Sequence, residues 1–104
     1  MSYELFIEPD VHELRKQLPG NIRQRIKRII DDFAANPRPT GSRRLVLPDA
    51  ETLDEIEIWR FRLEHWRIVY AVNDTHQWVR IMSIRRRPPY NYQDIPDIIR
   101  RLAD

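Results

Sequence analysis

The fold is decided by residues 56–92, which read IEIWRFRLEHWRIVYAVNDTHQWVRIMSIRRRPPYNY. Three runs in which apolar and polar residues alternate follow one another here, over 56–63, 66–73 and 77–84, with short polar breaks between them. Successive side chains of a strand point to opposite faces of a sheet. The alternation therefore predicts an antiparallel sheet with one packed face and one exposed, positively charged face.

The first two runs indicate which side chains share a face. In the first run, Trp59 and Phe61 alternate with Arg60 and Arg62. In the second run, Arg67 lies between apolar residues and points away from them. The large apolar residues are expected to form the packed face, and the arginines the exposed one.

The N-terminal part of the chain predicts a strand and two helices. Residues 3–8 alternate weakly, and Pro9 suits the first turn of a short helix. A Pro-Gly pair at 19–20 ends that helix, and Asn21 is a candidate cap for a longer one. Apolar residues in the longer helix recur at helical spacing, which predicts a stripe that packs on the sheet. The stripe consists of Ile22, Ile26, Ile29, Ile30 and Phe33.

The remaining segments complete the expected fold. Residues 44–47 predict a brief strand or an extended loop, 85–92 hold too many prolines for a ladder strand, and 93–104 show helical spacing. No internal repeat or linker divides the chain, so residues 1–104 predict a single domain. The fold class is α+β: an N-terminal strand, a helical hairpin, a three- to four-stranded mainly antiparallel sheet and a short C-terminal helix.

Charge and composition narrow the function classes. The formal net charge is only +2, but residues 58–92 hold seven arginines and two acidic residues. This concentration suggests a polyanionic partner, although a solvated face that pairs with its own carboxylates fits the composition equally well. The absence of cysteine excludes disulfides and thiolate sites and fits a cytoplasmic protein. No signal peptide or membrane-spanning run is expected, and the three scattered histidines predict no metal site.

The chain resembles the RelE/ParE superfamily of bacterial type II toxin–antitoxin toxins, and within it the RelE-like branch. Two motifs carry the resemblance, WRIVY at 66–70 and IRRRPPYNY at 84–92, together with the order of a helical hairpin before a sheet. The resemblance covers nearly the whole chain. It implies a RelE-like microbial ribonuclease-type fold.

The resemblance also implies an activity and partners. RelE-like members are metal-independent endoribonucleases (mRNA interferases) without a cofactor, which cut mRNA, typically in the ribosomal A site, and so inhibit translation. The 2′-hydroxyl upstream of the scissile bond attacks the phosphorus and leaves a cyclic phosphate. A cognate antitoxin protein blocks the toxin, and operator DNA is bound only through the toxin–antitoxin complex.

The matching positions carry site roles over to this chain. The residues that the resemblance makes catalytic are Arg60, Arg67, Arg87 and Tyr92. The expected substrate contacts are Arg62, Arg85, Arg86 and Tyr90. Arginines fixed on a rigid sheet can stabilise the charge that develops on the phosphate, each by about 3 kcal/mol of barrier. The tyrosines can stack on or orient a nucleotide.

One departure from the family pattern leaves the general base open. RelE members carry lysines on the strand before the middle strand, where this chain has Ile58 and Arg60. Arginine does not lose its proton in proteins, so the candidate acid–base groups are Glu57, Glu64 and His65. The missing lysine leaves two alternatives: a ParE-like toxin that inhibits DNA gyrase without cutting RNA, and an inactive relative that only binds its antitoxin or nucleic acid.

Overall fold

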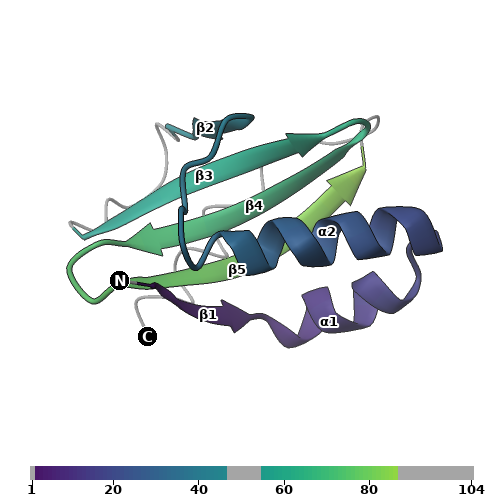
Figure 1. The fold of residues 1–104 in the computed structure, drawn as a ribbon, viewed down its shortest axis with the longest axis horizontal. Helices are drawn as coiled ribbons and strands as arrows, with labels where there is room; N and C mark the ends of the chain where they lie inside the picture. Colours follow the sequence, from purple (N-terminus) through teal and green to yellow (C-terminus); the bar gives the residue numbers. More distant parts are fainter. Residues whose placement is uncertain (1, 47–54, 87–104) are drawn as a thin grey trace.

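A computed structural model describes residues 2–46 and 55–86 of the 104-residue chain. The described elements are β1 (Glu4–Ile7), α1 (Pro9–Lys16), α2 (Gly20–Asp32), β2 (Ser42–Arg44), β3 (Ile56–Leu63), β4 (Trp66–Asn73) and β5 (Trp78–Arg86). The strands form one five-stranded sheet in the order β1-β5-β4-β3-β2 (Figure 1). The predicted α+β class is confirmed, and so is the predicted order of a strand, two helices and a run of strands over the described residues.

The sheet is mixed rather than purely antiparallel. Strands β2, β3, β4 and β5 pair antiparallel in sequence order, as the alternating runs predict. The N-terminal strand β1 pairs parallel with β5 and forms one edge. A parallel neighbour requires a long connection, which here contains both helices and β2 to β4.

A proline lies at the N-terminus of each helix. Pro9 occupies the first turn of α1, where its missing N–H costs nothing, and Asp10 follows it. The N-cap residue of α2 is Pro19 instead of the predicted Asn21, and the helix itself begins at Gly20. The predicted stripe is confirmed, because Ile22, Ile26 and Ile30 are buried.

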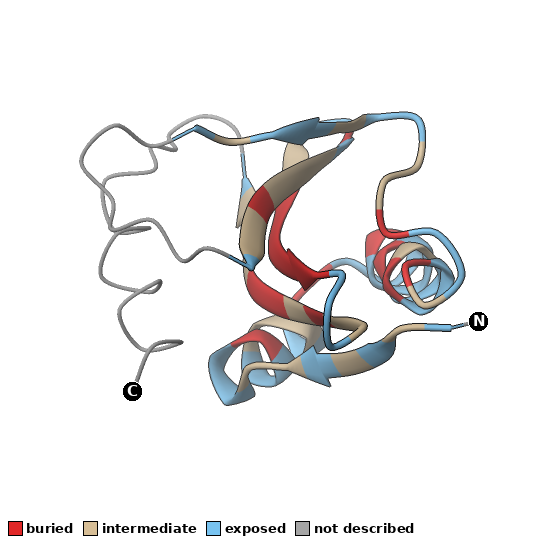
Figure 2. Cartoon of the chain, turned by 90° about the vertical axis from the view of Figure 1, so that its left-hand side faces the viewer, coloured by how far each residue is buried: buried red, intermediate tan, exposed pale blue. Residues whose placement is uncertain are grey.

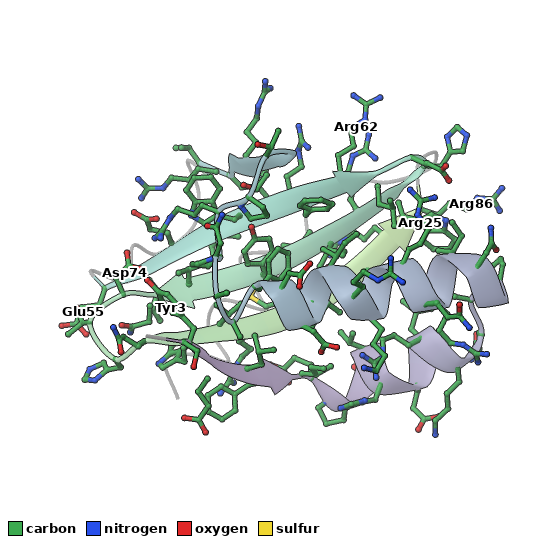
Figure 3. The ribbon with its side chains drawn as sticks, in the orientation of Figure 1. Tyr3, Arg25, Glu55, Arg62, Asp74 and Arg86 are labelled. Carbon is green, nitrogen blue, oxygen red and sulfur yellow. The ribbon has the colours of Figure 1, made fainter. Side chains whose placement is uncertain are left out.

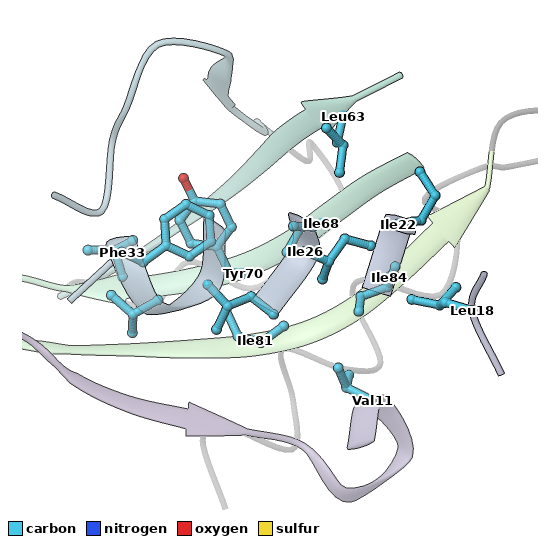
Figure 4. Packing of buried hydrophobic residues seen from close by; sticks show 13 residues of the cluster. Val11, Leu18, Ile22, Ile26, Phe33, Leu63, Ile68, Tyr70, Ile81 and Ile84 are labelled. Carbon is cyan, nitrogen blue, oxygen red and sulfur yellow. The ribbon is translucent and has the colours of Figure 1, made fainter. Parts of the chain in front are cut away.

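The main core lies between the helices and one side of the sheet, here called the helix-covered face (Figures 2 and 4). Phe33 follows α2 and stacks on Tyr70 of β4 with ring centroids 4.2 Å apart. The Tyr70 hydroxyl donates a 2.7 Å hydrogen bond to the Pro37 carbonyl. Burial raises the pKa of Tyr70 to about 12. This bond ties the loop after α2 to the centre of the sheet.

The opposite side of the sheet, here called the arginine face, carries Arg43, Arg60, Arg62, Arg67 and Arg85. The prediction that this face is exposed throughout is wrong for β4, where Val69, Ala71 and Arg67 are buried. The prediction considered the arginines and overlooked the apolar residues Val69 and Ala71 beside them, whose burial away from water is favourable. Arginines are nevertheless exposed on the flanking strands, at Arg43 and Arg62.

Two predicted boundaries also need correction. The strand expected at 44–47 is Ser42–Arg44, and β5 runs on through Arg85 and Arg86 instead of ending at residue 84. The prolines that argued against pairing begin only at residue 88, so both arginines still pair with β4. The expected C-terminal helix at 93–104 lies outside the described residues. Within the described part, neither helix has the length and apolar character needed to cross a membrane.

Candidate nucleic-acid interface

Five arginines come together on the arginine face through strand register. Arg67 on β4 lies directly between Arg62 on β3 and Arg85 on β5. One step along the sheet, Arg60 on β3 faces Arg43 on β2. Like charges directly opposite each other destabilise a sheet. An arrangement of this kind therefore points to an anionic ligand.

A β-bulge in β5 places Arg85 in this group. The register shifts between Val69 and Tyr70, which pair with Ser83 and Ile81, so Met82 is the extra residue. A bulge re-aims the side chains that follow it. Strict alternation would put Arg85 and Arg80 on opposite faces, but both pair with β4 residues of the arginine face. The sequence carries a signal for the bulge: Ile81 and Ile84, both buried in the core, are three residues apart.

Arg67 is the buried member of the group, with 3% of its surface exposed. Its Nη1 donates hydrogen bonds to the carbonyl oxygens of Glu64 (2.8 Å) and Trp66 (2.9 Å). Glu64 lies in the β3–β4 turn and has a positive φ of 52°, a conformation that few side chains adopt without support. Arg67 therefore stabilises the turn that connects the strands carrying its neighbours.

The other predicted arginines differ in their placement. Arg60 is half-buried and Arg62 is exposed, and within the described residues neither forms an ion pair with a carboxylate. The Arg85 Nε donates a 3.0 Å hydrogen bond to the Ser83 hydroxyl. Arg86 is exposed but pairs with Trp66, so it belongs to the helix-covered face and not beside Arg85. The structure separates two neighbours that the sequence grouped together.

The candidate acid–base groups are also separated. Glu57 alternates with Ile58 and so shares the helix-covered face with Trp59. The Glu64 carboxylate forms a 3.1 Å ion pair with Arg25 of α2. His65 is exposed in the β3–β4 turn, close in sequence to Arg62 and Arg67. Of the three candidates, only His65 has no described ion pair.

A cluster at the other end of the sheet was not anticipated from the sequence. Arg38, in the loop after α2, donates two hydrogen bonds to Asp74 in the β4–β5 turn (Nη1 to Oδ1 3.2 Å, Nη2 to Oδ2 2.7 Å) and one to Glu57 (2.8 Å). Tyr3 donates a 2.6 Å bond to Asp74, and the Trp59 indole a 3.0 Å bond to Glu57. We call these five residues the Arg38 cluster. Figure 3 shows Tyr3 and Asp74 at the end of the sheet opposite Arg62.

The Arg38 cluster shifts the pKa values of its acidic members. Hydrogen bonds from Arg38 first, and then from Tyr3, lower the pKa of Asp74. Hydrogen bonds from Arg38 first, and then from Trp59, lower the pKa of Glu57. The two carboxylates in turn raise the pKa of Arg38, Asp74 most of all. The guanidinium also lies over the Trp59 ring, 5.4 Å from its centroid. Its charge is therefore fully engaged within the protein.

Arg80 lies apart from the five arginines, near the β1 edge. Its guanidinium is 5.5 Å from the Phe6 ring centroid and 5.8 Å from that of Trp78, and its Nη1 is 3.5 Å from Glu8 Oε1. A shallow hollow of about 180 Å³ beside it is lined by Phe6, Ile7, Glu8 and Arg80.

Three predicted site residues, Arg87, Tyr90 and Tyr92, lie outside the described residues. Among residues 2–46 and 55–86, no three His, Asp or Glu side chains are grouped closely enough to hold a metal ion.

The family comparison identifies the class of protein. Residues 8–88 match the model of a family described as the ParE toxin of the type II toxin–antitoxin system parDE. The chain therefore belongs to the ParE toxin family and is a toxin of a type II toxin–antitoxin system, within the RelE/ParE superfamily. No match was found among curated proteins.

Three solved structures with a similar fold contain RelE toxins. The fold is similar to that of an archaeal RelE–RelB complex from Pyrococcus horikoshii OT3 (TM-score 0.73, 22% identity, 86% of this chain and 100% of that chain covered). It is also similar to a RelBE toxin–antitoxin complex from Mycobacterium tuberculosis (0.66, 18%, 84% and 100%). A mutant of the E. coli toxin RelE in the free state matches over 98% of this chain and 99% of its own (0.64, 18%). At these identities the similarity establishes the fold.

Proposed function

We propose that this toxin is a metal-independent endoribonuclease that cuts mRNA on the arginine face, acts in the ribosome and stops translation. The observation that carries the proposal is the row of Arg62, Arg67 and Arg85, with Arg60 beside it. Cleavage by the upstream 2′-hydroxyl places extra negative charge on the non-bridging phosphate oxygens. Donors held on a sheet before the reaction stabilise that charge without reorganising.

The proposal divides the arginines by their exposure. Arg60 and Arg62 would contact the phosphate directly, because they are accessible and have no described carboxylate partner. Arg67 would stabilise the β3–β4 turn, and its buried positive charge would contribute to the attraction of the phosphate. Arg87 and Tyr92, which follow β5 in the sequence, are proposed from the family resemblance to contact the phosphate and the nucleotide. Arg85 and Tyr90 would add substrate contacts.

The proton from the 2′-hydroxyl needs an acceptor. His65 is proposed for this role, since it is exposed in the turn beside Arg62 and Arg67 while Glu57 and Glu64 are paired on the other side of the sheet. Imidazole is the side chain that exchanges protons most readily near neutral pH.

A cognate antitoxin is the proposed protein partner. Two of the structurally similar toxins were solved as complexes with RelB-type antitoxins. An acidic segment that orders on binding would suit the arginine face, and operator DNA would be reached only through such a complex. The site of action would be the cytoplasm.

Inhibition of DNA gyrase is the second candidate function. The description of the matching family, ParE, favours it, as does the absence of a lysine at positions 58 and 60. A gyrase inhibitor has no need of a phosphate-cleaving site. This reading explains the arginines as contacts to a partner.

Pulse-induced expression in a bacterial host separates the two candidates. Radiolabelled amino acid and thymidine incorporation would be followed in parallel, with primer extension on an abundant transcript. The proposal expects an early fall in protein synthesis together with new transcript ends, both lost in Arg60→Ala/Arg62→Ala. Arg23→Ala/Arg28→Ala, two exposed arginines of α2, is the control with the same loss of charge. Intact transcripts with an early fall in DNA synthesis would transfer the assignment to gyrase inhibition.

A further inference from the structure

We propose that Arg43 on the edge strand β2 is a further phosphate contact, which extends the RNA-binding surface across the sheet from β5 to β2. This inference rests on the proposed function and adds a residue to its substrate site. Neither the sequence motifs nor the family resemblance singles out Arg43. Only the pairing of β2 with β3 brings it to the arginine face.

The position of Arg43 is set by register. It pairs directly with Arg60, so their side chains leave the same side of the sheet about 5 Å apart at the backbone. Neighbouring strands are about 4.8 Å apart, so Arg43 on β2 and Arg85 on β5 are separated by about 14 Å across the sheet. The arginines thus form a band wider than one phosphate group.

The surroundings of Arg43 favour an external anion. Arg43 is exposed, and within the described residues it forms no ion pair, although Arg60 directly opposite repels it. A solitary charge on an edge strand can also serve to prevent sheets from joining. That explanation does not require the charge to face Arg60, and Arg44, next in the strand, would serve equally well.

Arg44 provides a matched control on the same strand. It pairs with Trp59, so it faces the helix-covered side, and its Nη1 is 3.7 Å from Glu57 Oε2. Both arginines are exposed, and either change to alanine removes one positive charge from β2. A difference in RNA binding between the two variants therefore cannot come from net charge; it comes from the face that each side chain occupies and from the contact of Arg44 with Glu57.

RNA is the proposed ligand because the band continues the proposed cleavage site. An acidic protein segment would be attracted by the same charges, so it must be tested separately. Binding to a single-stranded RNA depends steeply on salt, and each phosphate contact contributes about 0.7 to the slope of log affinity against log salt concentration.

The test measures binding of a 2′-O-methyl RNA oligonucleotide, which cannot be cleaved by its own 2′-hydroxyl, by fluorescence anisotropy over a series of salt concentrations. Wild type, Arg43→Ala and Arg44→Ala are compared, and thermal unfolding checks that all three are folded. Arg43→Ala is expected to weaken binding several-fold at low salt and to reduce the slope by about 0.7. Arg44→Ala is expected to match the wild type.

Several results would overturn the inference. Equal slopes in all three proteins, or equal reductions in both variants, would show that Arg43 makes no specific phosphate contact. A loss confined to binding of a polyglutamate peptide would assign Arg43 to a protein partner. If Arg43→Ala cuts transcripts and binds RNA like the wild type, only this inference fails; if the wild type neither cuts transcripts nor binds the oligonucleotide, the proposed nuclease function fails with it.

Discussion

The Arg38 cluster and the arginine face use arginine in opposite ways. In the Arg38 cluster, one guanidinium is shared by two carboxylates and covered by an indole ring. On the arginine face, Arg43, Arg60 and Arg62 have no carboxylate partner among the described residues, and each pairs across the strands with another arginine. The first arrangement satisfies its charge within the fold. The second leaves charge for a ligand, which is why we assign a structural role to the Arg38 cluster and a functional role to the arginine face.

Loss of Arg60 and Arg62 should produce the largest effect, and only on activity. Each donor is expected to contribute about 3 kcal/mol to lowering the barrier, so either single change to alanine should reduce transcript cleavage at least ~100-fold. The free energy of unfolding should change by less than about 0.5 kcal/mol, because neither side chain forms an ion pair with a carboxylate among the described residues. Primer extension after induction and urea unfolding of the same variants measure the two effects. A parallel loss of stability would show that Arg60 and Arg62 stabilise the fold, as Arg38 does, and would contradict this contrast.

Arg67 should combine both kinds of effect. Arg67→Ala removes two part-buried hydrogen bonds to the carbonyls of Glu64 and Trp66, which should cost about 2 kcal/mol of unfolding free energy. Cleavage should also fall, since the turn between β3 and β4 would lose its support. Arg67→Lys, which keeps the charge and a donor, should recover part of both. Full stability in Arg67→Ala would show that the two hydrogen bonds do not hold the turn.

Replacement of Arg38 should have the opposite effects to replacement of Arg60: a loss of stability without a loss of cleavage. Arg38→Ala removes three hydrogen bonds to carboxylates, and after allowance for partial exposure of the partners it should cost about 1.5 kcal/mol of unfolding free energy. Cleavage by the folded protein should be unchanged, because Arg38 contacts Glu57 and Trp59 on the helix-covered face, and Asp74 lies at the end of the sheet opposite Arg62 (Figure 3). Urea unfolding gives the stability. A loss of cleavage larger than the loss of folded protein would place Arg38 in the functional site.

Acidic pH should have the smallest of these effects: it should remove the stability that the Arg38 cluster contributes. The folded-state pKa values of Asp74 and Glu57 are lowered, so their contribution is present above the unfolded values near 4 and is lost as pH falls through the folded values. The stability difference between wild type and Arg38→Ala should therefore be largest near pH 7 and shrink as the pH falls below the unfolded values. A difference that does not vary with pH would mean that the carboxylates do not stabilise the fold through Arg38.

Local patterns in the sequence predicted the strands well. The alternation over 56–63 and 66–73 gave the bounds of β3 and β4, and it separated Trp59 and Phe61 from Arg60 and Arg62. These strands follow strict alternation without a bulge, so a period of two is enough to assign their faces.

What the sequence did not reveal depends on contacts between distant residues. The bulge at Met82 reverses the faces after it and brings Arg85 to Arg67, against strict alternation. The burial of Arg67 follows from its place on the central strand. Arg38 lies in a proline-rich loop, 36 residues from Asp74 and 19 from Glu57, so no periodicity could connect them. The role of Arg43 required the register of a three-residue edge strand.

The most direct test of the account compares Arg60→Ala with Arg38→Ala in one experiment. Each protein would be added at equal folded concentration to a cell-free translation reaction, the rate of transcript cleavage would be measured, and the free energy of unfolding would be determined on the same preparation. We predict that Arg60→Ala loses at least ~100-fold in cleavage rate with unchanged stability, while Arg38→Ala loses about 1.5 kcal/mol of stability with unchanged cleavage. Cleavage that falls equally in both variants, or in neither, would contradict the assignment of the arginine face as the functional site.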